Sequence, residues 1–353
     1  MIKLLKHYLI KRANIILIAT SILVLIIFIS QIGENYIYAP TSIKDTAPRP
    51  INLPIGYLAW FSIILAVFAA VMEFNFKMSK ISIDQMYSLP IKRHKLYIVK
   101  YLIGLTEIII PLLFSFITMY VIIASKEHLF NLSLIIPYFI CLIAVTILFY
   151  TAIVFFFTRC NSTLDGVINV ILGSISLPIL LHLIDSLFRI RNFSIDIEYS
   201  YFYPIINVTS IFSELINNKE LRDLDINTFY LSLSFIIMTV VPMITYSLLT
   251  LKNEKSENTE YPSNSIFAYR FTIPLYLVCG ISTILDNSLL IIFFVGIGGY
   301  LGFVLKNRKF KIPKTDLIIL VFSITLGIIL GLILSIKTSI GPIIYYTNYI
   351  NYF

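Results

Sequence analysis

The sequence has few charged residues for its length. Asp, Glu, Lys and Arg make up 13% of the 353 residues, whereas apolar residues make up 58%. A soluble domain carries roughly a quarter charged residues, because polar side chains must cover its core. The mean hydropathy of +0.89 agrees with this reading. The composition therefore excludes an ordinary soluble domain and predicts an all-α integral membrane protein of the cell membrane.

Cysteine and histidine are also scarce. The three cysteines, Cys141, Cys160 and Cys279, lie within or beside apolar runs, so they form neither a disulfide framework nor a metal-binding spacing. None of the four histidines lies in an H-E-x-x-H or similar ligand pattern. We therefore expect this chain to bind no metal ion and no cofactor of its own.

A nucleotide-binding motif is missing as well. No glycine is followed by lysine, which excludes a P-loop. The segment "GIGGYLG" at Gly296–Gly302 lacks the preceding strand that would give it meaning as a nucleotide fingerprint. Its glycines at 298 and 302 are four residues apart, as are those at 327 and 331. This spacing favours close packing between helices in a membrane.

Long apolar runs are abundant. A helix needs about 20 residues to cross a bilayer core of roughly 30 Å, and runs near that length predict a polytopic bundle of eight or nine transmembrane helices. The two short runs near Phe271 and Leu289 are either a hairpin of two spans or one broken element. The predicted spans are Asn14–Ile32, Gly56–Phe74, Leu102–Ile123, Leu134–Phe157, Gly166–Leu187, Tyr230–Leu251, Phe271–Leu285, Leu289–Leu305 and Asp316–Ile336.

The basic residues predict the orientation. Nineteen of the 27 lie in five groups: before the first span, between the second and third, after the fourth, after the sixth and before the last. All five groups fall on one side if the Phe271 and Leu289 runs both cross. The positive-inside rule makes that side cytoplasmic. The N-terminus is then inside, and the tail from Lys337 to Phe353 is outside.

The regions outside the spans contain no linker long enough to hold a soluble domain, so we expect a single transmembrane domain over residues 1–353. Met1–Ala13 is amphipathic and predicts an interfacial helix in the membrane plane. Asn14–Ile32 is too long for a signal-peptide core and is expected to be retained. The external segments are Gly33–Pro54 and Phe188–Phe229, and the second is expected to contain a short helix around Ser210–Asn217.

Few ionisable residues lie inside the predicted spans. Glu107 lies about one and a half turns into the third span and should face protein or water, because a charge in lipid is costly. It either pairs with Lys100 or Arg12 or belongs to a substrate path. His182 and Asp185 share a helix face and form either a proton relay or an interfacial pair at a helix end.

The internal loop Asn75–Tyr101 is predicted to fold as helix, break and helix. Asp84 is expected to cap a short helix, the Leu89-Pro90 pair ends it, and Lys92–Lys100 leads into the third span as a basic, amphipathic helix. A topology signal does not need the apolar side chains of this loop. They either dock on a partner or dip into the lipid interface. They are Met86, Tyr87, Leu89 and Ile91.

The segment "MYSLPIKRHKLYIVKYLIG" resembles the corresponding loop of ABC-2 type permeases, the membrane subunits of bacterial ABC exporters. The resemblance rests on Leu89-Pro90-Ile91, Arg93, Leu96 and Lys100-Tyr101. It extends to the N-terminal amphipathic stretch and to the aromatic-proline pair Tyr203-Pro204. Family members more often have six spans, so the additional C-terminal spans depart from the pattern.

The resemblance implies that the loop is a coupling helix that binds an ABC ATPase subunit. ATP and Mg²⁺ would be bound by that subunit, and the permease would form a homodimer or pair with a sister permease. Glu107 remains a candidate for the translocation path. Nucleic acid is not an expected partner. The residues that would contact the ATPase are Asp84, Met86, Tyr87, Leu89, Pro90, Lys92, Arg93 and Lys95.

Two other classes of function stay open. An ion-coupled secondary transporter would need buried carboxylates near the middle of the membrane and an inverted repeat, and the sequence has no evident repeat. A membrane enzyme or sensor would need a cluster of His, Ser or Asp at depth, and the spans contain no convincing one. The sequence therefore favours a permease without catalytic activity of its own.

Overall fold

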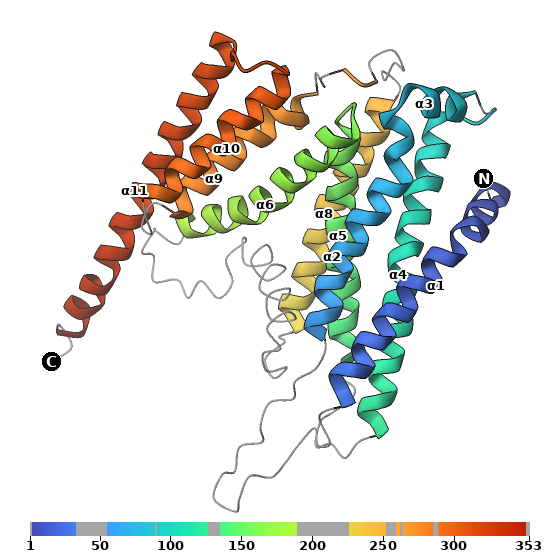
Figure 1. Ribbon diagram of the computed structural model, residues 1–353. Helices are drawn as coiled ribbons and strands as arrows, with labels where there is room; N and C mark the ends of the chain where they lie inside the picture. Colours follow the sequence, from blue (N-terminus) through green and yellow to red (C-terminus); the bar gives the residue numbers. More distant parts are fainter. Residues whose placement is uncertain are drawn as a thin grey trace, which may run out of the picture. The chain divides into compact units, whose positions relative to one another are not determined.

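Figure 1 shows the computed structural model of the chain. It describes residues 2–32, 55–88, 90–125, 135–188, 226–251, 259–261, 263, 265–284 and 289–350. All regular structure in these ranges is helical, which confirms the predicted all-α class. The expected external segment at 33–54 and almost all of the one at 188–229 lie outside the described residues, as does the short helix expected at Ser210–Asn217.

The helices belong to two compact units. Unit 1 comprises residues 1–155 and 207–256, and unit 2 comprises residues 156–206 and 257–353. The described helices of unit 1 are α1 (Ile2–Ile32), α2 (Ile55–Phe74), the 3₁₀ turn η1 (Asn75–Met78), α3 (Lys80–Tyr87), α4 (Arg93–Ser125), most of α5 (Ile135–Thr158) and α8 (Ile226–Thr250). Those of unit 2 are α6 (Thr163–Phe188), the short helical turn η7 (Ile266–Arg270), α9 (Phe271–Ile284), α10 (Leu289–Asn307) and α11 (Lys314–Ile350).

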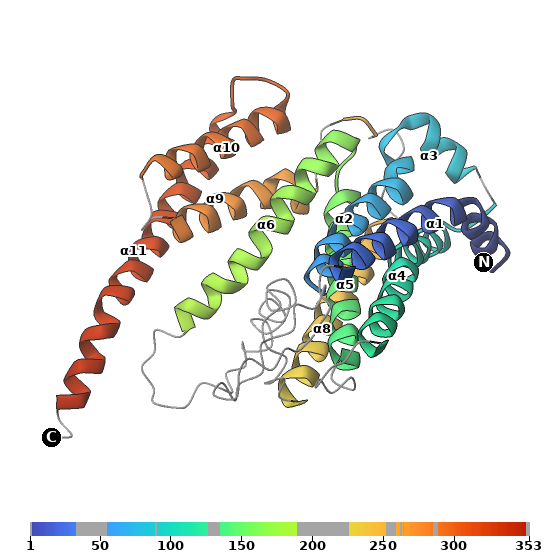
Figure 2. The same ribbon diagram turned by 60° about the horizontal axis from the view of Figure 1, so that its bottom comes forward.

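Helix α4 is the central element of unit 1. It packs against both α1 and α2, and the three helices lie side by side in Figures 1 and 2. Aromatic side chains join it to α5: the rings of Phe116 and Phe139 stack with centroids 3.9 Å apart, and the hydroxyls of Tyr101 and Thr151 share a hydrogen bond of 2.7 Å. A small apolar core joins α5 to α8. Unit 1 is therefore a helical bundle built around α4.

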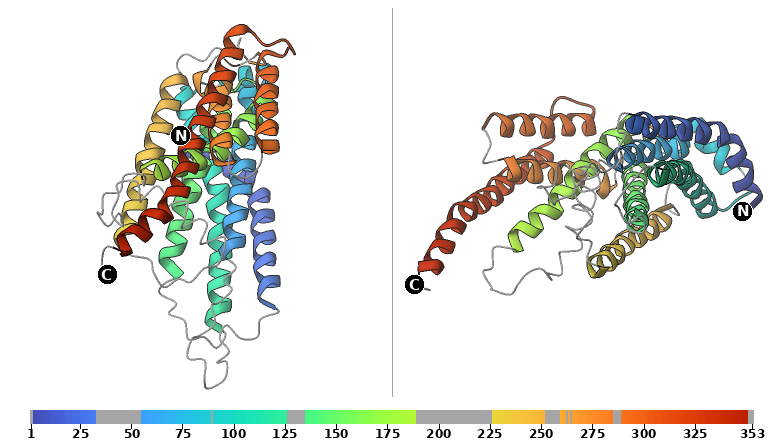
Figure 3. Two further views of the ribbon diagram at one scale, coloured as in Figure 1. Left: turned by 90° about the vertical axis from the view of Figure 1, so that its left-hand side faces the viewer. Right: turned by 90° about the horizontal axis from the view of Figure 1, so that it is seen from below.

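Helix α9 is the central element of unit 2. It packs against α6, α10 and α11, and the last two lie beside it in Figure 3. Its buried residues Ile273, Leu277 and Ile281 recur every four residues, as expected for one helix face. A β-carbon on Gly302 would lie 3.1 Å from Ile273, and one on Gly327 would lie 3.0 Å from Ile281. These contacts confirm the packing role predicted for Gly302 and Gly327.

The predicted spans coincide with helices throughout the described residues, although α1 and α4 begin earlier and α11 ends later than expected. α9 and α10 are separate helices packed against each other, so the Phe271 and Leu289 runs are not one broken element. Five further helices contain shorter apolar stretches, of 10–17 residues, among the residues whose side chains the structure describes. Within the described ranges, four helical stretches are long and apolar enough to cross a membrane, by length and composition: Leu5–Ile29, Trp60–Met78, Arg93–Ile122 and Lys314–Ile333.

The N-terminal helix differs from the expectation. A separate interfacial helix at Met1–Ala13 is not observed, because α1 runs without a break over 31 residues, from Ile2 to Ile32. At 1.5 Å per residue this helix is about 46 Å long, which exceeds a bilayer core of roughly 30 Å. Tyr8 and Arg12, in its first part, contact Met86 and Glu73. This side of the first turns therefore packs on protein rather than on lipid.

Candidate functional site

The loop between α2 and α4 folds as helix, break and helix, as the sequence predicts. The turn η1 ends at Met78, α3 follows, and α4 begins at Arg93. The break includes Pro90, and proline disfavours helical backbone at the residue before it. Leu89, one of the predicted contact residues, lies outside the described residues.

The start of α3 differs from the prediction. Its N-cap is Ser79, whose side-chain oxygen accepts a hydrogen bond from the backbone N–H of Ser82 at 3.4 Å. Asp84 lies within the helix, where its backbone carbonyl accepts from Ser88 at 2.9 Å. A helix capped at Asp84 would have room for less than one turn before Ser88. Beginning at Lys80 gives α3 eight residues and buries Ile83.

The two faces of α3 have different roles. Ile81, Asp84, Gln85 and Ser88 are exposed, and their spacing places them on one side of the helix. Ile81, the one large apolar side chain of this set, is 76% exposed. Ile83 is buried on the opposite side. We call the first four residues the outer face of α3.

Two of the predicted contact residues make contacts within the chain. The sulfur of Met86 accepts a hydrogen bond from the Tyr8 hydroxyl of α1 at 3.6 Å. The ring of Tyr87 lies under the guanidinium of Arg93, 4.4 Å from its centroid. Both Met86 and Tyr87 are half-buried. These side chains hold α3 in place, whereas the outer face is the part available to a partner.

The other predicted contact residues that the structure describes lie in α3 or shortly after it, and those after it form an exposed basic segment. Pro90, Lys92, Arg93 and Lys95 are all exposed, as is Asp84. α3 and this segment therefore present an apolar side chain, polar side chains and several cations to the surroundings. Ile81 and Gln85 were not predicted from the sequence. Once the start of the helix is known, the i, i+3, i+4 spacing of Ile81, Asp84 and Gln85 indicates that they share one face.

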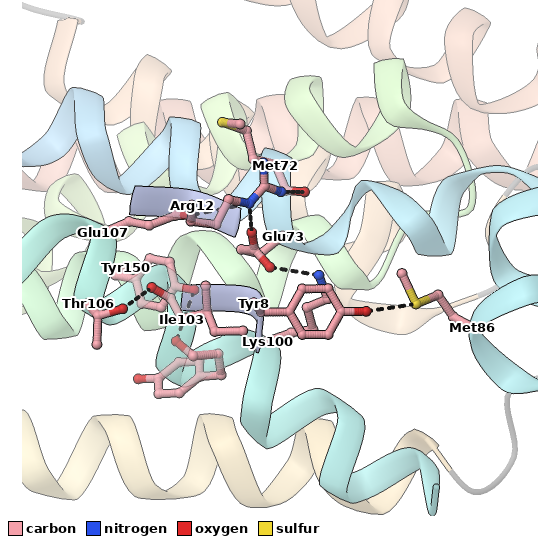
Figure 4. Close-up of polar contacts among 11 residues, drawn as sticks. Tyr8, Arg12, Met72, Glu73, Met86, Lys100, Ile103, Thr106, Glu107 and Tyr150 are labelled. Carbon is pink, nitrogen blue, oxygen red and sulfur yellow. Dashed lines mark hydrogen bonds and ion pairs between the residues drawn. The ribbon is translucent and has the colours of Figure 1, made fainter. Parts of the chain in front are cut away.

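Four charged side chains meet inside unit 1, as Figure 4 shows. The Glu73 carboxylate of α2 accepts from Arg12 Nε of α1 at 2.7 Å and from Lys100 Nζ of α4 at 2.9 Å. Glu107 of α4 lies 3.4 Å from the same Arg12 nitrogen. The two carboxylates are at least 95% buried at their side chains. We call these four residues the charge cluster.

The charge cluster answers the question of what Glu107 pairs with. Of the two predicted partners, Arg12 lies at ion-pair distance, whereas Lys100 pairs with Glu73. Oxygen Oε1 of Glu107 is buried and makes no hydrogen bond. Two acids and two bases balance in charge, which reduces the cost of burying them. Glu107 nevertheless has the weakest contacts of the four.

Tyr8 connects α3 to the charge cluster. Its hydroxyl donates to Met86 of α3, and its ring lies under the ammonium group of Lys100, 4.1 Å from the ring centroid. Lys100 in turn donates to Glu73. A continuous series of contacts therefore runs from α3 through α1 to α4 and α2, and all these side chains are visible in Figure 4. A displacement of α3 would act directly on three long helices.

Glu73 was missed from the sequence. It is the next-to-last residue of α2, where a charge is commonly read as the end of an apolar run. The sequence predicts that Glu73 lies near the same side of the membrane as Lys100 and Arg12. This shared side could have indicated that the three residues pair. His182 and Asp185 lie in α6, but the structure does not describe their side chains. Among the described residues, no group of three or more His, Cys, Asp or Glu could hold a metal ion.

Unit 2 has a second polar cluster, formed where three loops meet. Glu260 donates its backbone N–H to the carbonyl of Asn161 at 2.8 Å, and Arg308 donates to the carbonyl of Glu260 at 2.9 Å. Asp165 accepts from the Tyr269 hydroxyl at 2.9 Å. These loops follow the fourth span, follow the sixth span and precede the last span, and their basic residues predict that all three lie on the same side of the membrane. In the structure the three loops contact one another.

Cys160 lies in the first of these loops and is buried. Burial, together with the nearby carboxylate of Asp165, raises the pKa of its thiol well above the usual range. The thiolate is the reactive form of cysteine. The folded chain should therefore react slowly with thiol reagents at this position.

Comparison of the chain with models of protein families, with curated proteins and with solved structures found no match.

Proposed function

We propose that the chain is the transmembrane permease subunit of a bacterial ABC exporter. In this proposal eight or nine helices cross the cell membrane, the N-terminus is cytoplasmic, and a separate subunit binds and hydrolyses ATP. The main support is α3. It is a two-turn helix between two long apolar helices, and its exposed outer face combines Ile81 with polar side chains beside exposed cations.

The contacts of α3 suggest how hydrolysis would act on the membrane helices. Closure of two ATPase subunits would move α3, and Met86 would transmit the movement to Tyr8 of α1. Tyr8 contacts Lys100, which pairs with Glu73. Because α1, α2 and α4 meet at this cluster, they would move together between inward-open and outward-open states. The substrate would be hydrophobic or amphipathic, such as a peptide, lipid or drug, and the permease would act as a homodimer or with a sister permease.

The proposal is tested by affinity capture of the chain from gently solubilised native membranes, with bound proteins identified by mass spectrometry. The test variant is Lys92→Glu/Lys95→Glu, which reverses two exposed charges and leaves Arg93 over Tyr87. The matched control is Lys309→Glu/Lys311→Glu, an equal change of charge at another exposed loop. We expect a Walker-motif ATPase to bind the unchanged chain and the control, but not the test variant.

Two outcomes would contradict this proposal. The chain would not be an ABC permease if no ATPase were captured from a folded sample. The coupling role of α3 would be wrong if the ATPase bound the test variant as well as it bound the control. An additional Ile81→Asp variant, which changes the outer face without touching the basic segment, should also lose the ATPase.

An ion-coupled secondary transporter is the second candidate. It is favoured by Glu107, a buried carboxylate whose Oε1 makes no hydrogen bond and which lies close to a second carboxylate on Glu73. Such a site could exchange a proton during transport. Uptake or efflux in vesicles that follows an imposed proton gradient without ATP, and that disappears in Glu107→Gln, would establish this function instead.

A further inference from the structure

The loop between α10 and α11 carries unusual surface chemistry. Its sequence from Arg308 to Lys314 is "RKFKIPK". The Phe310 side chain is 81% exposed, and the lysines on either side of it are exposed as well. We call residues 308–314 the basic loop. An exposed aromatic ring between two cations is not needed for folding, so its role should be external.

The shape of the basic loop is specified by particular contacts. The Tyr300 hydroxyl of α10 donates to the Phe310 carbonyl at 2.9 Å. Tyr300 precedes the end of α10 by about two turns, so the chain folds back along the helix that it has just left. Arg308, directly after α10, has a φ of 50°, a conformation that favours glycine. Its guanidinium donates to the Glu260 carbonyl at 2.9 Å. The position of Phe310 is therefore fixed rather than incidental.

The nearby buried acids are already paired. Asp316 accepts from Lys306 at 2.7 Å and from Asn307 at 2.8 Å. Asp165 accepts from Tyr269, and Arg308 lies 3.7 Å from its other oxygen. In the part of the chain that the structure describes, no ion pair involves Lys309, Lys311 or Lys314. The positive charge of the basic loop is thus left for an external anion.

The flanking helices place the loop at the edge of an apolar surface. α10 exposes large apolar side chains along one stripe, and the last of them is Leu305. α11 exposes a similar stripe that begins at Leu317. Such stripes require hydrocarbon around them in a membrane protein. The basic loop lies where both stripes end, so a bilayer that covers the two stripes would place the loop near the lipid headgroups.

We propose that the basic loop is a binding site for anionic phospholipid headgroups. Lys309 and Lys311 bind the headgroup phosphates, and the Phe310 ring inserts beside them into the interface. A cationic loop with one apolar side chain matches an anionic leaflet in both charge and polarity. The site needs only a membrane around the chain. It does not depend on an ABC ATPase or on transport.

The single tryptophan of the chain provides a direct test. Trp60 is 55% exposed on α2 and serves as a reference position in the unchanged protein. A Trp60→Phe/Phe310→Trp variant moves the reporter to the basic loop. Both purified full-length proteins are reconstituted in nanodiscs of mixed phosphatidylcholine and phosphatidylglycerol. One of the two lipids carries brominated acyl chains, which quench nearby tryptophan.

At position 310 we expect brominated phosphatidylglycerol to quench more than brominated phosphatidylcholine, with a relative affinity of about 30-fold, because two lysines near an anionic surface contribute on the order of 1 kcal/mol each. At Trp60 the two lipids should quench equally. Adding Lys309→Gln/Lys311→Gln to the reporter variant should abolish the preference. Adding Lys6→Gln/Lys11→Gln, an equal loss of exposed charge on α1, should preserve it.

Three results would overturn the proposal. Equal quenching by both lipids at position 310 would show that the loop does not select anionic lipid. No quenching by either lipid would place the loop in water and favour a soluble acidic partner. Loss of the preference in the Lys6/Lys11 variant would show that overall charge, rather than this loop, attracts the lipid. The ratio between the two lipids cancels differences in folded yield.

Discussion

The two polar clusters of the molecule are built on different principles. In unit 1, the charge cluster joins three helices mainly through ion pairs between side chains, and both of its carboxylates are almost fully buried. In unit 2, the cluster around Asp165 relies on backbone carbonyls and a tyrosine hydroxyl, and the side chain of Arg308 is 52% exposed. The first cluster is a balanced set of buried charges. The second is a set of hydrogen bonds that joins three loops.

This difference predicts different tolerance to mutation. Removing one member of a buried ion pair leaves its partner charged and without compensation, at a cost of about 3–5 kcal/mol. A half-exposed ion pair contributes about 0–1 kcal/mol, because water screens it. Unit 1 should therefore lose much more stability than unit 2 when a single charge is deleted. Buried Cys160 and Cys279 both lie in unit 2, so a thiol-reactive dye follows the unfolding of that unit. The fluorescence of Trp60, on α2, follows the unfolding of unit 1.

The largest effect is expected for Glu73→Ala. The substitution leaves Arg12 and Lys100 with only Glu107 to balance them, and the free energy of unfolding should fall by about 3–5 kcal/mol. The measurement is thermal unfolding in detergent, followed by the fluorescence of Trp60, which lies in unit 1 with Glu73. The variant Glu73→Leu/Lys100→Met removes one acid and one base together. It should recover most of the loss, and equal instability of the two variants would argue against an electrostatic cause.

A smaller effect, from packing, is expected at the glycines of the two units. A β-carbon on Gly104 of α4 would overlap the hydroxyl oxygen of Tyr150, and one on Gly299 of α10 would overlap the end of the Leu277 side chain. Both neighbours are fully buried. Gly104→Ala should cost about 1–3 kcal/mol, and Gly299→Ala should cost less because leucine ends in a branched group that can rotate.

Gly296 is the matched control for these variants. A β-carbon there would meet nothing within 4 Å, so Gly296→Ala should leave the unfolding temperature unchanged or raise it slightly. Tyr150→Phe removes the oxygen that lies nearest to the new methyl group, and it should partly rescue Gly104→Ala. A failure of this rescue would locate the strain in the helix backbones instead.

The next effect separates stability from transport within the charge cluster. Glu107 has a single ion pair, at 3.4 Å, whereas Glu73 has contacts at 2.7 Å and 2.9 Å. Glu107→Gln should therefore cost less than Glu73→Gln, about 1–2 kcal/mol. Under the proposed permease function, ATP-driven transport by the chain reconstituted with its ATPase partner should persist in Glu107→Gln if the cluster is structural. Its complete loss in a folded variant would assign Glu107 to the translocation path.

Much of the fold could be predicted from the sequence because apolar runs define membrane helices. The span expected at Gly56–Phe74 is α2 to within one residue, and the runs at Leu134–Phe157 and Phe271–Leu285 are α5 and α9. The break near Pro90 was also predicted, since proline restricts the backbone locally. These features depend on composition and on neighbours in the sequence. A single chain therefore contains enough information to predict them.

The site was predictable only in part, because its contacts join distant residues. The Tyr8 hydroxyl meets Met86, 78 residues away, and no local pattern indicates that pairing. Asp84 and Ser79 are both good capping residues, and burial of Ile83 decided between them. Glu73 and Glu107 meet because α2 and α4 pack together. Lys100 and Arg12 were both possible partners of Glu107 from the sequence, and only the packing shows that Arg12 lies at ion-pair distance from it.

The smallest effect is expected at Arg308, where ion pairing and backbone strain oppose each other. Its φ of 50° favours glycine, and its guanidinium lies 3.7 Å from Asp165. Arg308→Ala loses the ion pair and keeps the strained conformation, whereas Arg308→Gly loses the ion pair and relieves the strain. The glycine variant should therefore be more stable than the alanine variant by about 1 kcal/mol. Thermal unfolding of both variants, measured beside Glu73→Ala, provides the check. Equal stability of the two would mean that the left-handed turn after α10 costs nothing, and a loss as large as that of Glu73→Ala would remove the distinction between the two clusters.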